Sequence, residues 1–110
     1  MTQEVSQADF KQEVLDQQTP VLVDFWAPWC GPCHMQAKIR ERMEGAQEER
    51  DFKILKVNVD ERSEVAATFG IRGIPTIMIF YEGKLCTTFT GVQEDSTLMS
   101  AIFACPEKAE

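Results

Sequence analysis

The sequence predicts an α/β fold in which a central mixed β-sheet is flanked by helices on both faces. Helix-like and strand-like segments alternate through the first two thirds of the chain, and two adjacent strands and a helix complete it. The first strand-like segment, residues 21–26, is apolar at nearly every position, which is typical of a strand covered on both faces.

The first predicted element is a helix that begins at Ser6. This residue is a capping type, and Phe10, Val14 and Leu15 follow it on one helical face. The strand at residues 21–26 comes next, so the chain is expected to enter the sheet directly after its first helix.

A long helix is expected from about Cys33 toward Glu49. Met35, Ile39 and Met43 recur four residues apart, which predicts a shared apolar face. The charged positions are expected to be exposed: Lys38, Arg40, Glu41, Arg42 and Glu44.

The same patterns place the rest of the chain. The expected elements are a strand at residues 52–59, a helix at 63–69 that Gly70 ends, hairpin strands at 76–81 and 84–90, and a helix that Ser96 caps and Pro106 ends. The resulting order is α-β-α-β-α-β-β-α. Because no linker or repeat interrupts it, we expect one domain over residues 1–110.

Composition narrows the function. The 110 residues include 11 basic and 18 acidic side chains, a net charge of −7, and no basic cluster. This balance disfavours binding to nucleic acid or to an anionic membrane. No apolar stretch is long enough to cross a bilayer, and the N-terminus lacks the features of a secretory signal, so the expected location is the cytoplasm.

The four cysteines are unevenly spaced. Cys30 and Cys33 are separated by two residues, whereas Cys86 and Cys105 each stand alone. In a cytoplasmic chain this pattern predicts one redox or metal pair and two bystanders rather than a disulfide framework. We expect Cys86 to be a buried apolar side chain, and Cys105 is a candidate for an exposed thiol.

The pair lies in the sequence Trp-Cys-Gly-Pro-Cys, between a predicted strand and a predicted helix. This turn puts Cys30 at a helix N-terminus, where free N–H groups and the helix dipole stabilise a thiolate. Pro32 is tolerated in a first helical turn, and Gly31 lets another backbone approach the sulfur. One thiol could therefore attack a disulfide while Cys33, one turn away, resolves the product.

A structural zinc site is the alternative for this pair. It would need two further ligands, and the sequence offers His34, Cys86 and Cys105. Since there is no second C-x-x-C and no H-x-x-x-H, the spacing favours redox chemistry with no metal.

Several motifs in order resemble the thioredoxin family: VLVDFWAPWCGPC at residues 21–33, KVNVD at 56–60 and GIRGIPT at 70–76. The resemblance covers nearly the whole chain. It implies a thioredoxin fold and a monomeric enzyme that reduces disulfides of protein substrates. The redox centre would be the Cys30–Cys33 disulfide itself, with no other cofactor. Because the chain has no dinucleotide-binding motif, its electrons would come from a thioredoxin reductase.

The resemblance also assigns an acid to the site. Asp24 would exchange a proton with Cys33, and burial in an apolar strand would raise the pKa of this acid toward neutrality. Lys56 would be its charged partner. The alternatives are a structural Asp24 bonded to Lys56 or to the backbone, and an exposed lysine at a strand edge.

A substrate surface is implied around the attacking sulfur. Pro75 would be a cis-proline facing the disulfide, and Ile74 would offer its backbone N–H and C=O to an extended substrate segment. Trp29, Gly73 and Gly91 would complete a flat contact surface.

The chain departs from the family at two positions. His34 stands where the family most often has lysine, so the local positive charge would depend on pH, unless the side chain is an ordinary surface residue. Lys38 replaces a proline that kinks the family's helix, so this helix is expected to be straighter.

Two other functions share this fold. One is a disulfide oxidase or isomerase, and the other is a binding subunit that uses the surface around the disulfide without redox chemistry. The Gly31-Pro32 pair resembles that of the reducing thioredoxins, which favours a reductase.

Overall fold

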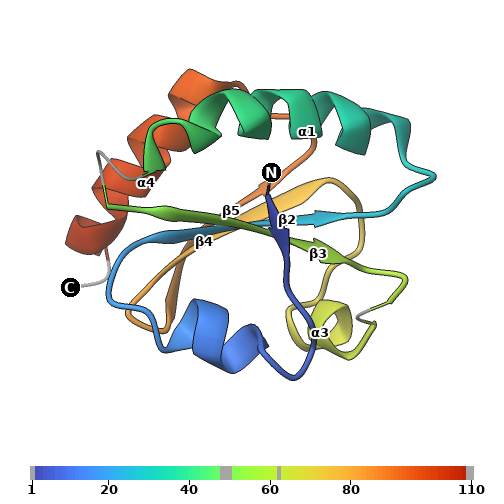
Figure 1. Ribbon diagram of the computed structural model, residues 1–110, viewed down its shortest axis with the longest axis horizontal. Helices are drawn as coiled ribbons and strands as arrows, with labels where there is room; N and C mark the ends of the chain where they lie inside the picture. Colours follow the sequence, from blue (N-terminus) through green and yellow to red (C-terminus); the bar gives the residue numbers. More distant parts are fainter. Residues whose placement is uncertain (1, 48–50, 62, 109–110) are drawn as a thin grey trace.

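The computed structural model describes residues 2–47, 51–61 and 63–108 (Figure 1). Its centre is a five-stranded sheet in the order β1 (Gln3–Glu4), β3 (Lys53–Asn58), β2 (Val21–Trp26), β4 (Thr76–Tyr81) and β5 (Lys84–Thr90). The first three of these strands are parallel, and β4 and β5 run antiparallel to their neighbours. The mixed sheet confirms the predicted fold class.

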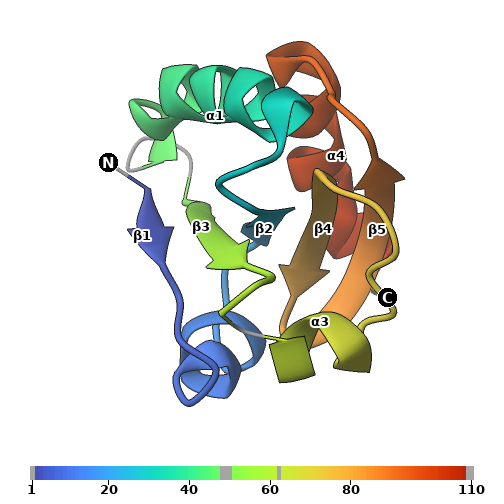
Figure 2. The same ribbon diagram turned by 90° about the vertical axis from the view of Figure 1, so that its right-hand side faces the viewer.

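Helices cover both faces of the sheet (Figures 1 and 2). The helices α1 (Gly31–Glu44) and α4 (Asp95–Lys108) lie on one face, and the short π-helix η1 (Lys11–Leu15) and α3 (Ser63–Thr68) lie on the other. Strand β2 therefore contributes to both cores. Val21, Val23 and Phe25 pack on the η1 side and Leu22 packs on the α1 side, all with at most 1% of their surface exposed.

The N-terminal segment differs from the prediction. The Ser6 hydroxyl accepts a hydrogen bond from the Asp9 N–H at 3.1 Å, as the capping signal implied. The helix that follows is a π-helix, because the Asp16 N–H donates a hydrogen bond to the Lys11 carbonyl five residues earlier. Strand β1 was not predicted, since two residues carry no periodic pattern.

Helix α1 buries Ile39 and Met43 as predicted, but its buried face also includes Arg40 and leaves out Met35. It ends at Glu44, and Glu49 lies outside the described residues. Met35 is 61% exposed, whereas Arg40, predicted on the outer face, is only 5% exposed. The buried positions recur three or four residues apart, and Met35, two residues after Cys33, lies beyond the edge of this face.

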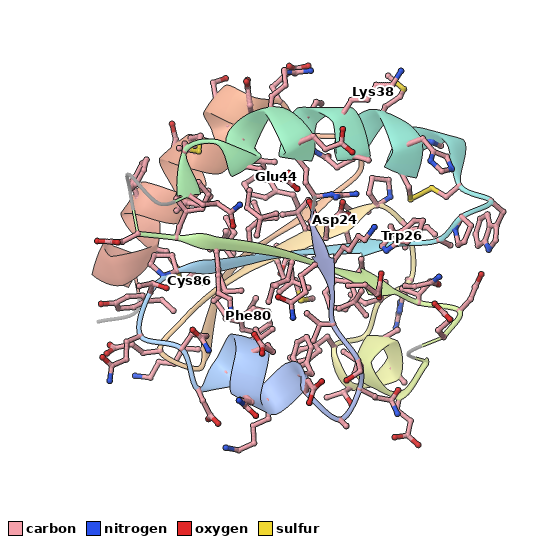
Figure 3. The ribbon with its side chains drawn as sticks, in the orientation of Figure 1. Asp24, Trp26, Lys38, Glu44, Phe80 and Cys86 are labelled. Carbon is pink, nitrogen blue, oxygen red and sulfur yellow. A yellow bond between two sulfur atoms is a disulfide. The ribbon has the colours of Figure 1, made fainter. Side chains whose placement is uncertain are left out.

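The outer face of α1 carries Lys38, which points away from the sheet (Figure 3). The helix is unbroken at this residue. A lysine keeps the backbone N–H that a proline would remove, so every turn can form its hydrogen bonds.

The last helix is longer than predicted at both ends. It begins at Asp95 rather than after Ser96, and it continues past Pro106 to Lys108. Proline removes one backbone donor, but Leu98, Ile102 and other fully buried side chains hold α4 against the sheet. Tertiary packing therefore outweighs the local stop signal.

The two isolated cysteines are not bystanders. Cys86 on β5 and Cys105 on α4 form a disulfide across 19 residues, with their Cα atoms 5.6 Å apart. Cys105 is fully buried, which also corrects its expected exposure. The sheet brings β5 beside α4, and sequence spacing alone does not reveal this proximity.

This second disulfide should stabilise the oxidised protein without taking part in exchange. We expect the Cys86→Ser/Cys105→Ser variant to lose about 3 kcal/mol of unfolding free energy, the chain-entropy value for a loop of this length. Denaturant titration measures the loss. In excess dithiothreitol wild type and variant should agree closely, and an equal difference in both conditions would contradict the disulfide as its origin.

None of the helices in the described part of the chain is both long and apolar enough to cross a lipid bilayer.

Candidate active site

The C-x-x-C pair lies where β2 passes into α1. Cys30 is the N-cap of α1, with extended backbone angles of φ −89° and ψ 110°, and Pro32 occupies the first turn. The Cys30 sulfur accepts a hydrogen bond from the Cys33 N–H at 3.2 Å. The two residues are disulfide-bonded, with Cα atoms 5.2 Å apart. A thiolate formed at Cys30 would thus face the positive end of the helix.

Both sulfurs are recessed. Cys30 is 4% exposed and Cys33 is 1% exposed, and they pack with Ala27 against Trp26, Val59 and Ile74. A substrate must therefore reach the edge of Cys30 along the surface next to it, while Cys33 is almost completely covered.

One wall of the site is the loop before β4. The Ile74–Pro75 peptide bond is cis, and the Ile74 carbonyl oxygen lies 3.7 Å from the Cys30 sulfur. The Pro75 carbonyl accepts a hydrogen bond from the Gly91 N–H at 2.8 Å. Gly91 has φ +92°, a left-handed conformation that favours glycine. The structure therefore brings Ile74, Pro75 and Gly91 together beside the disulfide.

A shallow pocket of about 190 Å³ lies next to this loop, and Trp29, Gly73 and Ile74 line it together. The Trp29 ring is 70% exposed and its Nε1–H donates to Asp60 at 2.9 Å, which fixes the orientation of the ring. An exposed aromatic side chain held in place is suited to contact with a protein partner.

Asp24 lies on β2, between the sheet and α1, the helix that begins at the disulfide (Figure 3). It is fully buried, and its Oδ2 accepts a hydrogen bond from the Arg40 Nε–H at 2.7 Å. Neither predicted partner, Lys56 or the backbone, makes this bond. Arg40 was predicted to be exposed because it is charged, but it lies on the buried face of α1.

Burial dominates the acidity of Asp24. Desolvation raises its pKa from 3.8 to about 6, although Arg40 and, more weakly, Lys56 lower it. Glu4 adds a small upward contribution. The carboxyl group therefore changes charge within reach of neutral pH.

Lys56 is not at a strand edge. It lies on β3, between β1 and β2, and is register-paired with Asp24. Its ammonium group sits over the Trp26 ring, 4.9 Å from the ring centre, where a cation is attracted by the aromatic face.

Two polar residues that support this region were not predicted from the sequence. Glu4 on β1 accepts hydrogen bonds from Trp26 Nε1 at 3.0 Å and from the Asn58 N–H at 2.7 Å. Gln36 is buried on α1 and exchanges hydrogen bonds with the backbone of Gln93, at 2.7 and 3.1 Å. Gln36 thereby ties the helix to the segment after Gly91. Both depend on contacts distant in sequence, for which no local signal exists.

His34 is exposed at the start of α1. Its Nε2 lies 2.7 Å from the Pro28 carbonyl oxygen, to which it can donate a hydrogen bond. Zinc ligands do not gather here: in the part of the chain that the structure describes, no three His, Cys, Asp or Glu side chains are grouped to hold a metal ion.

Comparison with known proteins gives consistent results. The thioredoxin family model matches residues 1–104. Thioredoxin 1 of Synechococcus elongatus is 50% identical over 99 residues, covering 89% of this chain and 91% of that protein. Thioredoxin 1 of a Nostoc species is 48% identical over 99 residues, covering 90% and 92%. The chloroplastic M-type thioredoxin of Chlamydomonas reinhardtii is 44% identical over 98 residues, covering 89% and 69%.

Proposed function

The chain belongs to the thioredoxin family and is a thiol–disulfide oxidoreductase that reduces protein disulfides, and we propose that Cys30 attacks and Cys33 resolves. The observation that carries these roles is the asymmetry of the pair. Cys30 caps α1 and its sulfur accepts a hydrogen bond from the Cys33 N–H, whereas Cys33 is less exposed than Cys30.

The proposed reaction has two exchanges. The Cys30 thiolate attacks a substrate disulfide, one substrate sulfur leaves as a thiolate and takes a proton, and a mixed disulfide remains. Cys33 then loses its proton and attacks the Cys30 sulfur. The bond between Cys30 and the substrate breaks, the Cys30–Cys33 disulfide forms, and the second substrate sulfur leaves and is protonated. The substrate gains two electrons and the dithiol loses two.

Asp24 is the proposed proton acceptor for Cys33. A pKa of about 6 leaves the carboxyl largely ionised at neutral pH, while it is basic enough to take a proton. Lys56 and His34 are proposed to tune the charge around the site, together with the Gly31-Pro32 turn. Trp29, Gly73, Ile74, Pro75 and Gly91 are proposed to bind the substrate segment.

The remaining parts of the proposal follow from the family. A thioredoxin reductase would return the disulfide to the dithiol, and the protein would act as a cytoplasmic monomer on disulfide-containing proteins, without a further cofactor and without nucleic acid. In that reducing compartment the Cys86–Cys105 disulfide would be reduced to two thiols. Reduction of insulin in the presence of NADPH and a thioredoxin reductase tests the proposal; an unreduced Cys30–Cys33 disulfide would contradict it.

Asp24→Asn separates the two exchanges. We expect it to slow resolution of the mixed disulfide by at least about tenfold while the initial attack changes little, because the amide cannot accept the Cys33 proton. Rapid-quench measurement with a chromogenic disulfide follows both steps. Equal slowing of the two, or of neither, would show that Asp24 is not the proton acceptor.

A further inference from the structure

Arg40 on α1 forms a buried ion pair with Asp24. Its side chain is 6% exposed, that of Asp24 is 0% exposed, and Nε and Oδ2 are 2.7 Å apart. We propose that Arg40 is a positioning residue for the resolving exchange, which orients the Asp24 carboxylate and holds it ionised. This inference rests on the proposed role of Asp24 as proton acceptor.

The two carboxylate oxygens of Asp24 are in different situations. Oδ2 is occupied by Arg40, whereas buried Oδ1 has no hydrogen-bond partner among the described residues. Such an atom is costly to leave unbonded in a folded protein. Arg40 therefore fixes the carboxylate by one oxygen and leaves the other as the position for an incoming proton.

Arg40, the partner of Asp24, and Cys33 both line one pocket of about 250 Å³. Cys33, Arg40, Lys56 and Trp26 are among its lining residues, on one side of the helix that carries the disulfide. The volume exceeds that of a single water several-fold, and the lining supplies polar groups. Water in this pocket would touch both Cys33 and the Arg40 side of the ion pair, so it could take the Cys33 proton close to Asp24.

The charges around Asp24 single out Arg40. Lys56 on β3 lowers the pKa of Asp24 and Glu4 on β1 raises it, both without a direct hydrogen bond. The residue paired with Asp24 on β4 is the apolar Ile77. His34 and Glu41 of α1 line the pocket next to Arg40. Arg40 is the largest influence that lowers the pKa of Asp24 against burial.

Arg40→Met tests the inference, because methionine fills a similar space without charge. We expect the pH midpoint of the resolving exchange to move upward by about one pH unit or more, the usual influence of a bonded opposite charge. Resolution should be several-fold slower than wild type below neutral pH, and the difference should close in alkaline solution. Attack by Cys30 should keep its rate and pH dependence.

Two companion variants sharpen the test. Arg40→Lys keeps a positive charge, so its midpoint should stay close to that of wild type. Arg42→Met is the matched control: this arginine lies on the same helix, is 56% exposed, and is 3.9 Å from Asp95, so its loss should leave the midpoint unchanged. An NMR titration of the Asp24 carboxyl carbon should show the same upward displacement in Arg40→Met, independently of turnover.

The outcomes are distinguishable. If Asp24→Asn slows resolution but Arg40→Met leaves both midpoint and NMR titration unmoved, the inference about Arg40 is overturned and the role of Asp24 stands. If Asp24→Asn resolves at the normal rate, the proposed proton acceptor is wrong, and the inference fails with it. Loss of rate at every pH without a shifted midpoint would make Arg40 merely structural.

Discussion

The Cys33→Ser variant is expected to accumulate stable mixed disulfides with its substrates, whereas Cys30→Ser is expected to form none and to lose reductase activity altogether. The Cys33 N–H donates to the Cys30 sulfur at the start of α1, so the first exchange requires Cys30 and the helix N-terminus only. Removing the Cys33 thiol deletes the second exchange. Non-reducing gels after incubation with a disulfide substrate measure the adducts.

The second disulfide supplies the control for this experiment. Cys86→Ser/Cys105→Ser removes both other thiols and should reduce substrates like wild type under conditions where it remains folded. Adducts through Cys86 or Cys105, or equal trapping by Cys30→Ser and Cys33→Ser, would contradict the assignment. Unchanged function with neither active-site thiol present would favour the binding-subunit alternative.

Asp24→Asn is expected to raise the free energy of unfolding by about 3 kcal/mol above neutral pH, the equivalent of a pKa raised from 3.8 to about 6. Between these two values the folded protein binds more protons at Asp24 than the unfolded chain does. Wild-type stability therefore falls as the pH rises through this window and is level above it. Asp24→Asn lacks this pH dependence, so the difference in unfolding free energy between variant and wild type should disappear as the pH falls to about 3.8.

The ion pair with Arg40 does not turn the expected gain in stability of Asp24→Asn into a loss. The pKa near 6 already includes the attraction of Arg40, and burial still prevails over it. Asp16→Asn is the matched control, because Asp16 is half exposed and pairs with Lys11 on the surface, where a salt bridge contributes about 0–1 kcal/mol. Denaturant titrations at several pH values measure both variants. A destabilised Asp24→Asn, or an advantage independent of pH, would contradict the balance described here.

If Asp24→Asn both gains stability and slows resolution, Asp24 lowers stability at neutral pH and accelerates the resolving exchange. A buried acid that costs stability and performs a proton transfer is a common compromise in enzymes. Arg40 would moderate the cost and, in the proposed role, set the pH at which the acid works.

Local patterns determined most of the fold and the centre of the site. Continuous apolar residues at 21–26 identified the doubly covered strand, and two cysteines at a strand-to-helix turn identified the redox pair. These features depend on neighbours along the chain, where burial periodicity and helix termini act over one or two turns. The resemblance of three motifs to one family supplied the rest of the expected site.

The tertiary structure decided which distant groups meet. The face of α1 that packs on the sheet includes both Cys33 and Arg40, which places Arg40 against Asp24 and leaves Met35 exposed to solvent. The packing of α4 on the sheet paired Cys86 with Cys105 and carried the helix through Pro106. Residue type and spacing do not encode these contacts, because an arginine or a cysteine has the same local pattern whether its face of the helix meets water or the sheet. The sequence by itself thus determined the chemistry of the exchange, and only the packing of helices on the sheet determined the charges and crosslinks around it.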